Sequence, residues 1–197
     1  MEKRVRRASF RVLFTALAAA FVARSAPAQE ACKMVMLPKP ALTLADVYGR
    51  AEKAAKAWKP DAVPVRVSNT IMGFLQPDGS STAWNLQFYS PSAKQLVAIN
   101  TLNGMFTCWA SPESSPGRIP DLKPGFFRDG AKLYAIAKEH AGALLSQGYG
   151  VMLGSAAAPE TRHATWYLNF TSKDSKNGPL TIIVDANSGK LEKVLKD

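Results

Sequence analysis

The residues best suited to chemistry in this 197-residue chain are two cysteines, Cys32 and Cys108, and two histidines, His140 and His163. The sequence contains no Cys-x-x-Cys, no His-Glu-x-x-His, no Gly-x-Ser-x-Gly and no glycine-rich phosphate loop. Its carboxylates are scattered, and none is paired with another at a spacing suited to acid–base work. We therefore predict no catalytic residue, no metal ligand and no cofactor.

Both histidines have simpler interpretations than catalysis. His140 falls on the apolar stripe of a predicted helix, where a histidine bonded to a neighbour is expected. His163 opens a strand on its polar side and is expected to be solvated, and Asp185 is interpreted as a turn residue. An enzyme that uses either histidine is the least favoured hypothesis.

The first 28 residues have the pattern of a cleaved secretory signal peptide. Five basic residues among the first eleven precede an apolar run over residues 12–23, and Ala26-Pro27-Ala28 supplies the small residues of a cleavage site. The run is too short to cross a bilayer, which needs roughly 20 residues. We expect a periplasmic or secreted protein that begins near Gln29 and has no stable membrane insertion after cleavage.

This location changes how the charge and the cysteines are interpreted. The chain carries a net charge of +10, but residues 1–28 hold six Lys or Arg and one Glu, so each part carries +5. Without a basic stripe interleaved with aromatic residues, nucleic acid is not an expected partner. In an oxidising compartment Cys32 and Cys108 are predicted to form a disulfide, the alternative being two unrelated thiols.

Two amphipathic helices are predicted to cover the strands. Apolar residues at spacings of three and four predict helices over residues 44–59 and 130–146, with Thr43 and Asp129 as N-caps.

Residues 84–90 and 166–172 share the pattern Trp-x-Leu-amide-Phe-x-Ser, with alternating polarity typical of strands. Tyr89 and Tyr167 alternate to the face opposite the large apolar residues. That face could pack the two repeats together, bind a partner or be solvated.

These elements predict an α+β fold of two tandem units, each with one helix packed on an antiparallel sheet of about four strands. The expected organisation is a signal peptide (1–28), an N-terminal extension (29–42), a first repeat (43–109), a linker (110–128) and a second repeat (129–197).

The second repeat resembles the PepSY family. Its final strand and turn read Ile-Val-Asp-Ala-Asn-Ser-Gly-Lys-Leu over residues 183–191, similar to the Val-Asp-Ala-x-x-Gly turn of PepSY domains. Residues 43–109 match PepSY domains more loosely, because Asn-Thr-Leu-Asn-Gly at 100–104 stands where the family has its Asp-Ala-x-x-Gly turn. The resemblance implies PepSY/cystatin-like units, which occur in peptidase propeptides and in exported proteins that restrain peptidases or bind other partners.

The sequence thus predicts an exported, non-catalytic binding protein that regulates or inhibits an extracytoplasmic partner such as a peptidase. Tyr89 and Tyr167 are the candidate interaction face. The alternative is a carrier of a lipid or another small apolar ligand. A closed apolar cavity of several hundred Å3 would favour the carrier, whereas filled cores and an exposed sheet face would favour the binding protein.

Overall fold

The computed structural model describes residues 29–111, 119–157, 163–172, 174 and 176–196. The predicted signal peptide lies outside this part of the chain, as does the middle of the predicted linker. The first half contains β1 (Gln29–Met36), β2 (Leu42–Thr43), α1 (Leu44–Trp58), β3 (Val63–Asn69), β4 (Ser80–Ser81), β5 (Ala83–Ser90), β6 (Gln95–Leu102) and β7 (Met105–Ser111). The second contains α2 (Gly130–Ser146), β8 (Gly150–Ala157), β9 (Ala164–Thr171), β10 (Asn177–Asp185) and β11 (Leu191–Lys196).

The helices begin where their capping residues predict. The Thr43 hydroxyl accepts a hydrogen bond from the Asp46 backbone N–H at 3.2 Å, and the Asp129 carboxylate accepts one from Lys132 N–H at 3.0 Å. Helix α1 ends one residue before its predicted limit and α2 matches its predicted limits. No helix among the described residues is long and apolar enough to cross a membrane.

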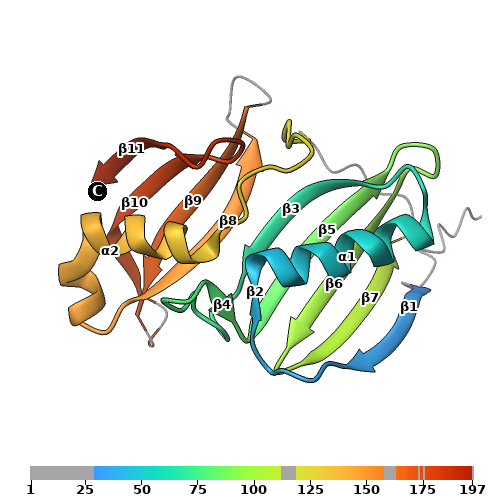
Figure 1. Ribbon diagram of the computed structural model, residues 1–197, viewed down its shortest axis with the longest axis horizontal. Helices are drawn as coiled ribbons and strands as arrows, with labels where there is room; N and C mark the ends of the chain where they lie inside the picture. The colour runs from blue at the N-terminus through green and yellow to red at the C-terminus, as the bar shows by residue number, and fades with distance from the viewer. Residues whose placement is uncertain (1–28, 112–118, 158–162, 173, 175, 197) are drawn as a thin grey trace, which may run out of the picture.

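All long strands join one antiparallel sheet in the order β1-β7-β6-β5-β3-β8-β9-β10-β11. Figure 1 shows both helices over the same face of this sheet. The large apolar residues of β5 and β9 point to that face, and Trp84 and Trp166 are both buried, as the alternation of polarity predicts. Each indole N–H donates to a backbone carbonyl just before a helix: Trp84 to Leu42 at 3.0 Å and Trp166 to Phe127 at 2.9 Å.

The predicted fold of two tandem helix-on-sheet units is wrong, because one sheet of nine strands runs through both halves of the described chain. Strands β3 and β8 meet antiparallel at Ser68 and Gly154. In separate units each would leave an edge of unpaired N–H and C=O groups, and joining these edges satisfies part of both. We call this junction, with the side chains that bridge it, the seam.

Asn69 is the principal polar bridge of the seam. Its side-chain amide donates to the carbonyls of Gly73 at 3.0 Å and Val151 at 3.1 Å, and its Oδ1 accepts from Leu153 N–H at 2.6 Å. The residue is only 2% exposed. The buried side-chain amide of Asn69 therefore takes the place of backbone hydrogen bonds that β3 and β8 do not form with each other here.

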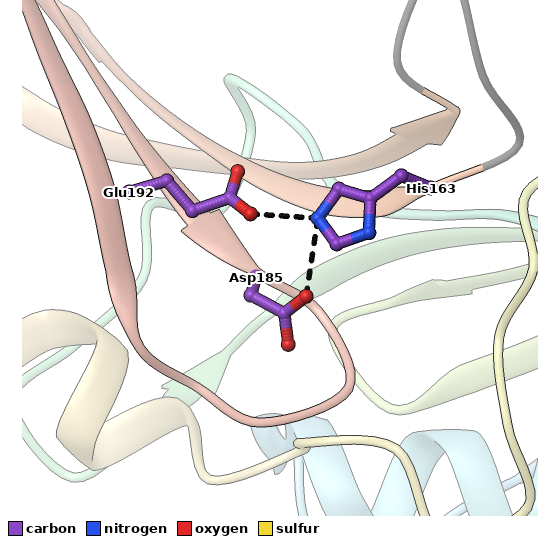
Figure 2. Close-up of side chains that lie close together, drawn as sticks. All are labelled: His163, Asp185 and Glu192. Atoms are coloured by element: carbon purple, nitrogen blue, oxygen red, sulfur yellow. Dashed lines mark hydrogen bonds and ion pairs between the residues drawn. The ribbon is translucent and has the colours of Figure 1, made fainter.

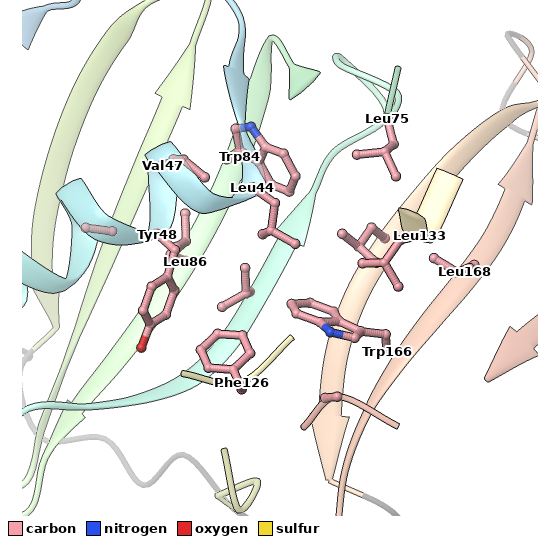
Figure 3. Packing of buried hydrophobic residues seen from close by; sticks show 14 of the residues in the cluster. Leu44, Val47, Tyr48, Leu75, Trp84, Leu86, Phe126, Leu133, Trp166 and Leu168 are labelled. Carbon is pink, nitrogen blue, oxygen red and sulfur yellow. The ribbon is translucent and has the colours of Figure 1, made fainter. Parts of the chain in front are cut away.

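Aromatic side chains bridge the same junction within the core. Phe126, which follows the middle of the predicted linker, packs edge-on against Tyr48 of α1 at 4.8 Å between ring centroids and lies 5.9 Å from Trp166 of β9. Figure 3 shows Phe126 between the two groups of core residues. The Arg128 guanidinium lies over the Tyr48 ring at 4.8 Å. The two halves consequently share a single hydrophobic core.

The predicted disulfide is confirmed. Cys32 of β1 lies directly opposite Cys108 of β7 and is bonded to it, with the Cα atoms 5.3 Å apart. The N-terminal extension therefore becomes the outermost strand of the sheet. A disulfide is typical of proteins that fold in an oxidising compartment.

Candidate functional site

Both described helices lie over one face of the sheet, and we call the opposite face the open face. One row of its residues crosses four adjacent strands in register: Asn85, Ser68, Gly154 and Tyr167. Such a row of amide, hydroxyl and aromatic groups can present hydrogen-bond donors and acceptors to a partner.

The structure places both predicted tyrosines on the open face and leaves them apart. Tyr167 of β9 lies one strand from the seam, opposite Gly154 of β8, whereas Tyr89 pairs with Val63 and Leu96 near the end of β5. Tyr89 is four residues along its strand from the row that holds Tyr167, about 13 Å at the usual rise. The two tyrosines therefore do not form one contact site.

A groove opens at the seam beside Tyr167. Beyond the Ser68–Gly154 pair, Val67 N–H donates to the Ser155 hydroxyl at 2.8 Å rather than to a backbone carbonyl, so the strands have separated. The resulting groove has a volume of about 380 Å3. Its lining comprises Val65, Arg66, Gly154, Ser155, Ala156, Tyr167 and Asn169.

Hydrogen-bond donors are the main polar groups of this groove. Arg66 is exposed, and within the described part of the chain its guanidinium has no hydrogen bond or ion pair. The Asn169 carbonyl oxygen accepts from the Thr181 hydroxyl at 2.9 Å, which orients the amide N–H groups of Asn169 away from that bond. The lining includes no carboxylate and no imidazole. The groove can therefore bind a carboxylate or a peptide carbonyl, but it lacks a general base.

Sequence reasoning missed Arg66 as a site residue. It lies in a strand whose alternation directs it to the open face, but nothing in the local sequence shows that β3 borders β8. The signal that could have found it is an isolated cation between two valines, Val65 and Val67, in a predicted strand.

A second groove lies between α1 and β1. It has a volume of about 350 Å3 and an apolar floor that includes Val35, Leu37 and Phe106. Three exposed cations, Lys33, Arg50 and Lys53, border it. An apolar floor with a cationic rim is suited to an amphiphile that carries an acidic head.

The histidines have different environments. His140 is partly buried in α2, with Nε2 3.9 Å from a Glu139 carboxylate oxygen. His163 Nε2 lies 2.6 Å from Glu192 Oε1 and 3.1 Å from Asp185 Oδ2 (Figure 2). The prediction of a solvated His163 thus missed a cluster of three potential metal ligands whose ligand atoms all lie within 4.8 Å of one another.

Asp185 is also the turn residue that the sequence predicts. Its Oδ1 accepts hydrogen bonds from the backbone N–H groups of Asn187 and Ser188, while Oδ2 faces His163. Partial burial raises the pKa of Asp185, but the hydrogen bonds from Ser188 and the nearby His163 outweigh it and hold the pKa below its usual value. This carboxylate is therefore kept ionised beside the imidazole.

Comparisons with family models, with curated proteins and with solved structures returned no match to this chain.

Proposed function

We propose that the protein is an exported, non-catalytic binding protein that regulates an extracytoplasmic partner, such as a peptidase, by holding a segment of it on the open face. The observation that carries the proposal is the groove at the seam, which Arg66, Tyr167 and Asn169 line on the open face. Export is supported by the signal pattern of residues 1–28 and by the Cys32–Cys108 disulfide.

The chemistry of the groove favours an extended, acidic segment as the occupant. The Arg66 guanidinium has no partner among the described residues, and a guanidinium can bind a carboxylate in a bidentate manner. Tyr167 provides rigid contact area beside it. The net charge of +5 on the chain after residue 28 favours an acidic partner further. The resemblance of residues 129–197 to PepSY domains supports a peptidase as that partner, by analogy of family alone.

Matched arginine variants test this proposal. The mature protein, immobilised and incubated with an envelope extract, should retain a specific protein whose binding is weakened at least about tenfold by Arg66→Gln, the usual effect of losing a buried charged contact. Arg50→Gln, which removes a cation from the other groove, should leave that binding unchanged. If Arg66→Gln and Tyr167→Ala both retained the partner as strongly as the unmodified protein does, the open face would be ruled out as the binding surface.

The alternative function, a carrier of a lipid or small apolar ligand, is favoured by the groove between α1 and β1. That groove opens to solvent, so it differs from the closed cavity expected of a carrier. Native mass spectrometry of the purified protein tests this alternative directly. A bound amphiphile that is lost in Arg50→Gln and kept in Arg66→Gln would favour the carrier over the binding protein.

A further inference from the structure

We propose that His163, Asp185 and Glu192 form a binding site for a divalent transition-metal ion of the zinc class. The three residues come from separate segments: His163 precedes β9, Asp185 ends β10 and Glu192 lies in β11. A bound ion would join the start of β9 to the hairpin that closes the sheet. The site is distinct from both grooves and does not depend on the proposed binding function.

The geometry places two carboxylate oxygens against one imidazole nitrogen. Glu192 Oε1 and Asp185 Oδ2 both face His163 Nε2, at 2.6 and 3.1 Å (Figure 2). A single N–H at this position could donate a good hydrogen bond to one oxygen only. A cation between the three atoms would instead be liganded by all of them, as zinc is by imidazole and carboxylate ligands.

The charges at the cluster also favour a bound cation. Within the described part of the chain, neither Asp185 nor Glu192 makes an ion pair with a lysine or an arginine. Two ionised carboxylates so close together repel each other, and a divalent ion bound between them would offset that repulsion.

The Asp185 ligand is held in place before any ion arrives. Asp185 Oδ1 is occupied by two backbone N–H groups of the turn, which leaves Oδ2 directed toward His163. The same turn is fixed to the preceding segment by Asn187, which donates to the Asp121 carbonyl at 3.0 Å and accepts from Lys123 N–H at 2.9 Å. Asp121 in turn pairs through its backbone with His163. Such outer contacts orient ligands and strengthen metal sites.

The donor set and its exposure indicate the class of metal. One imidazole with two carboxylates suits zinc and its neighbours better than calcium or magnesium, which prefer oxygen ligands alone. His163 and Glu192 are partly exposed, so an ion can enter from solvent and water can complete its coordination.

Zinc titration of the disulfide-bonded mature protein, in competition with a chromophoric chelator, tests the proposal. One Zn2+ should bind per chain, and Ca2+ should bind much more weakly. His163→Ala, Asp185→Asn and Glu192→Gln should each weaken zinc binding at least about tenfold. His140→Ala, which removes the other histidine, should bind zinc as the unmodified protein does.

A second measurement separates loss of the site from loss of the fold. The imidazole NMR signals of His163 should shift on adding zinc and those of His140 should not, with the circular dichroism of each variant unchanged. The proposal is overturned if the unmodified protein binds no zinc, if His163→Ala binds as tightly, or if zinc shifts His140 instead. In those cases the cluster is a hydrogen-bonded network only.

Discussion

The two ends of the nine-stranded sheet are closed in different ways. At one end β1 covers the edge of β7 and is bonded to it through Cys32–Cys108. At the other end β11 is the last strand, and it carries Glu192, Lys193 and Lys196 along an exposed edge. Charged residues on an edge strand oppose pairing with other chains. A covalent bond holds one terminal strand, whereas the other depends on hydrogen bonds and on the cluster at His163.

The helices over the two halves differ as well. Helix α1 is regular, whereas α2 has a non-helical residue at Ala141, with φ −137° and ψ 26°. Despite these differences each half buries a tryptophan, Trp84 or Trp166, in the shared core. Because the two halves share one sheet and one core across the seam, we expect them to unfold as a single cooperative structure.

Truncating the two tryptophans should have the largest effect. Trp84→Ala and Trp166→Ala should each lower the free energy of unfolding by roughly 3–5 kcal/mol, the usual cost of removing a large buried side chain. Because the core is shared, urea unfolding followed by circular dichroism should remain a single transition in both variants. Tyr167→Phe, on the open face, is the control and should be mild. Two separate transitions would show that the halves unfold independently.

Removing the disulfide should affect one end of the sheet selectively. The double variant Cys32→Ser/Cys108→Ser should lose roughly 3–5 kcal/mol of stability, because the bond closes a long loop in the unfolded chain. Hydrogen exchange measured by mass spectrometry should show β1 losing protection first. If β11 lost protection before β1, the proposed difference between the two ends would be wrong.

Asn69→Ala tests the seam itself. It should cost about 2–3 kcal/mol, because buried backbone groups at Gly73, Val151 and Leu153 lose their hydrogen-bond partner. Asn85→Ala is the matched control: its amide donates to Asn100 on the half-exposed open face, and its loss should cost less than about 1 kcal/mol. Equal losses in the two variants, measured by urea unfolding, would argue against Asn69 as the main polar bridge.

The smallest expected effect is the pH dependence that Asp61, in the first half, contributes to stability. Hydrogen bonds from Ser92 N–H and the Ser90 hydroxyl lower the pKa of Asp61 to about 2. Since the pKa is lower in the folded than in the unfolded chain, the stabilisation is complete above the ordinary value near 3.8. It is lost as the pH falls toward 2. Asp61→Asn should flatten the thermal stability profile between pH 4 and pH 2, and an unchanged slope would contradict the assignment.

The local elements could be predicted from the sequence because their causes lie within a few residues. Thr43 and Asp129 define the starts of the helices through their own side chains, and the alternation around Trp84 and Trp166 determines which face of each strand is buried. The pairing of Cys32 with Cys108 followed from the expected compartment.

The candidate sites were predicted only in part. Alternation alone directs Tyr167 to the open face, but the groove also needs Arg66, which belongs to the other half of the chain. The cluster at His163 escaped prediction because its carboxylates lie 22 and 29 residues further along the chain. Their approach depends on the register of β9, β10 and β11, which the sequence does not display.

The sequence by itself determined the helix limits, the caps, the buried face of each strand and the two cysteines available for a bond. Only the tertiary structure decided that two helix-and-strand halves would share one sheet and one core. That outcome rests on Asn69 reaching Val151 and on Phe126 packing between Tyr48 and Trp166. Contacts of this kind join residues far apart in the chain, and they form because an unpaired strand edge and an exposed aromatic group each lose free energy by finding a partner.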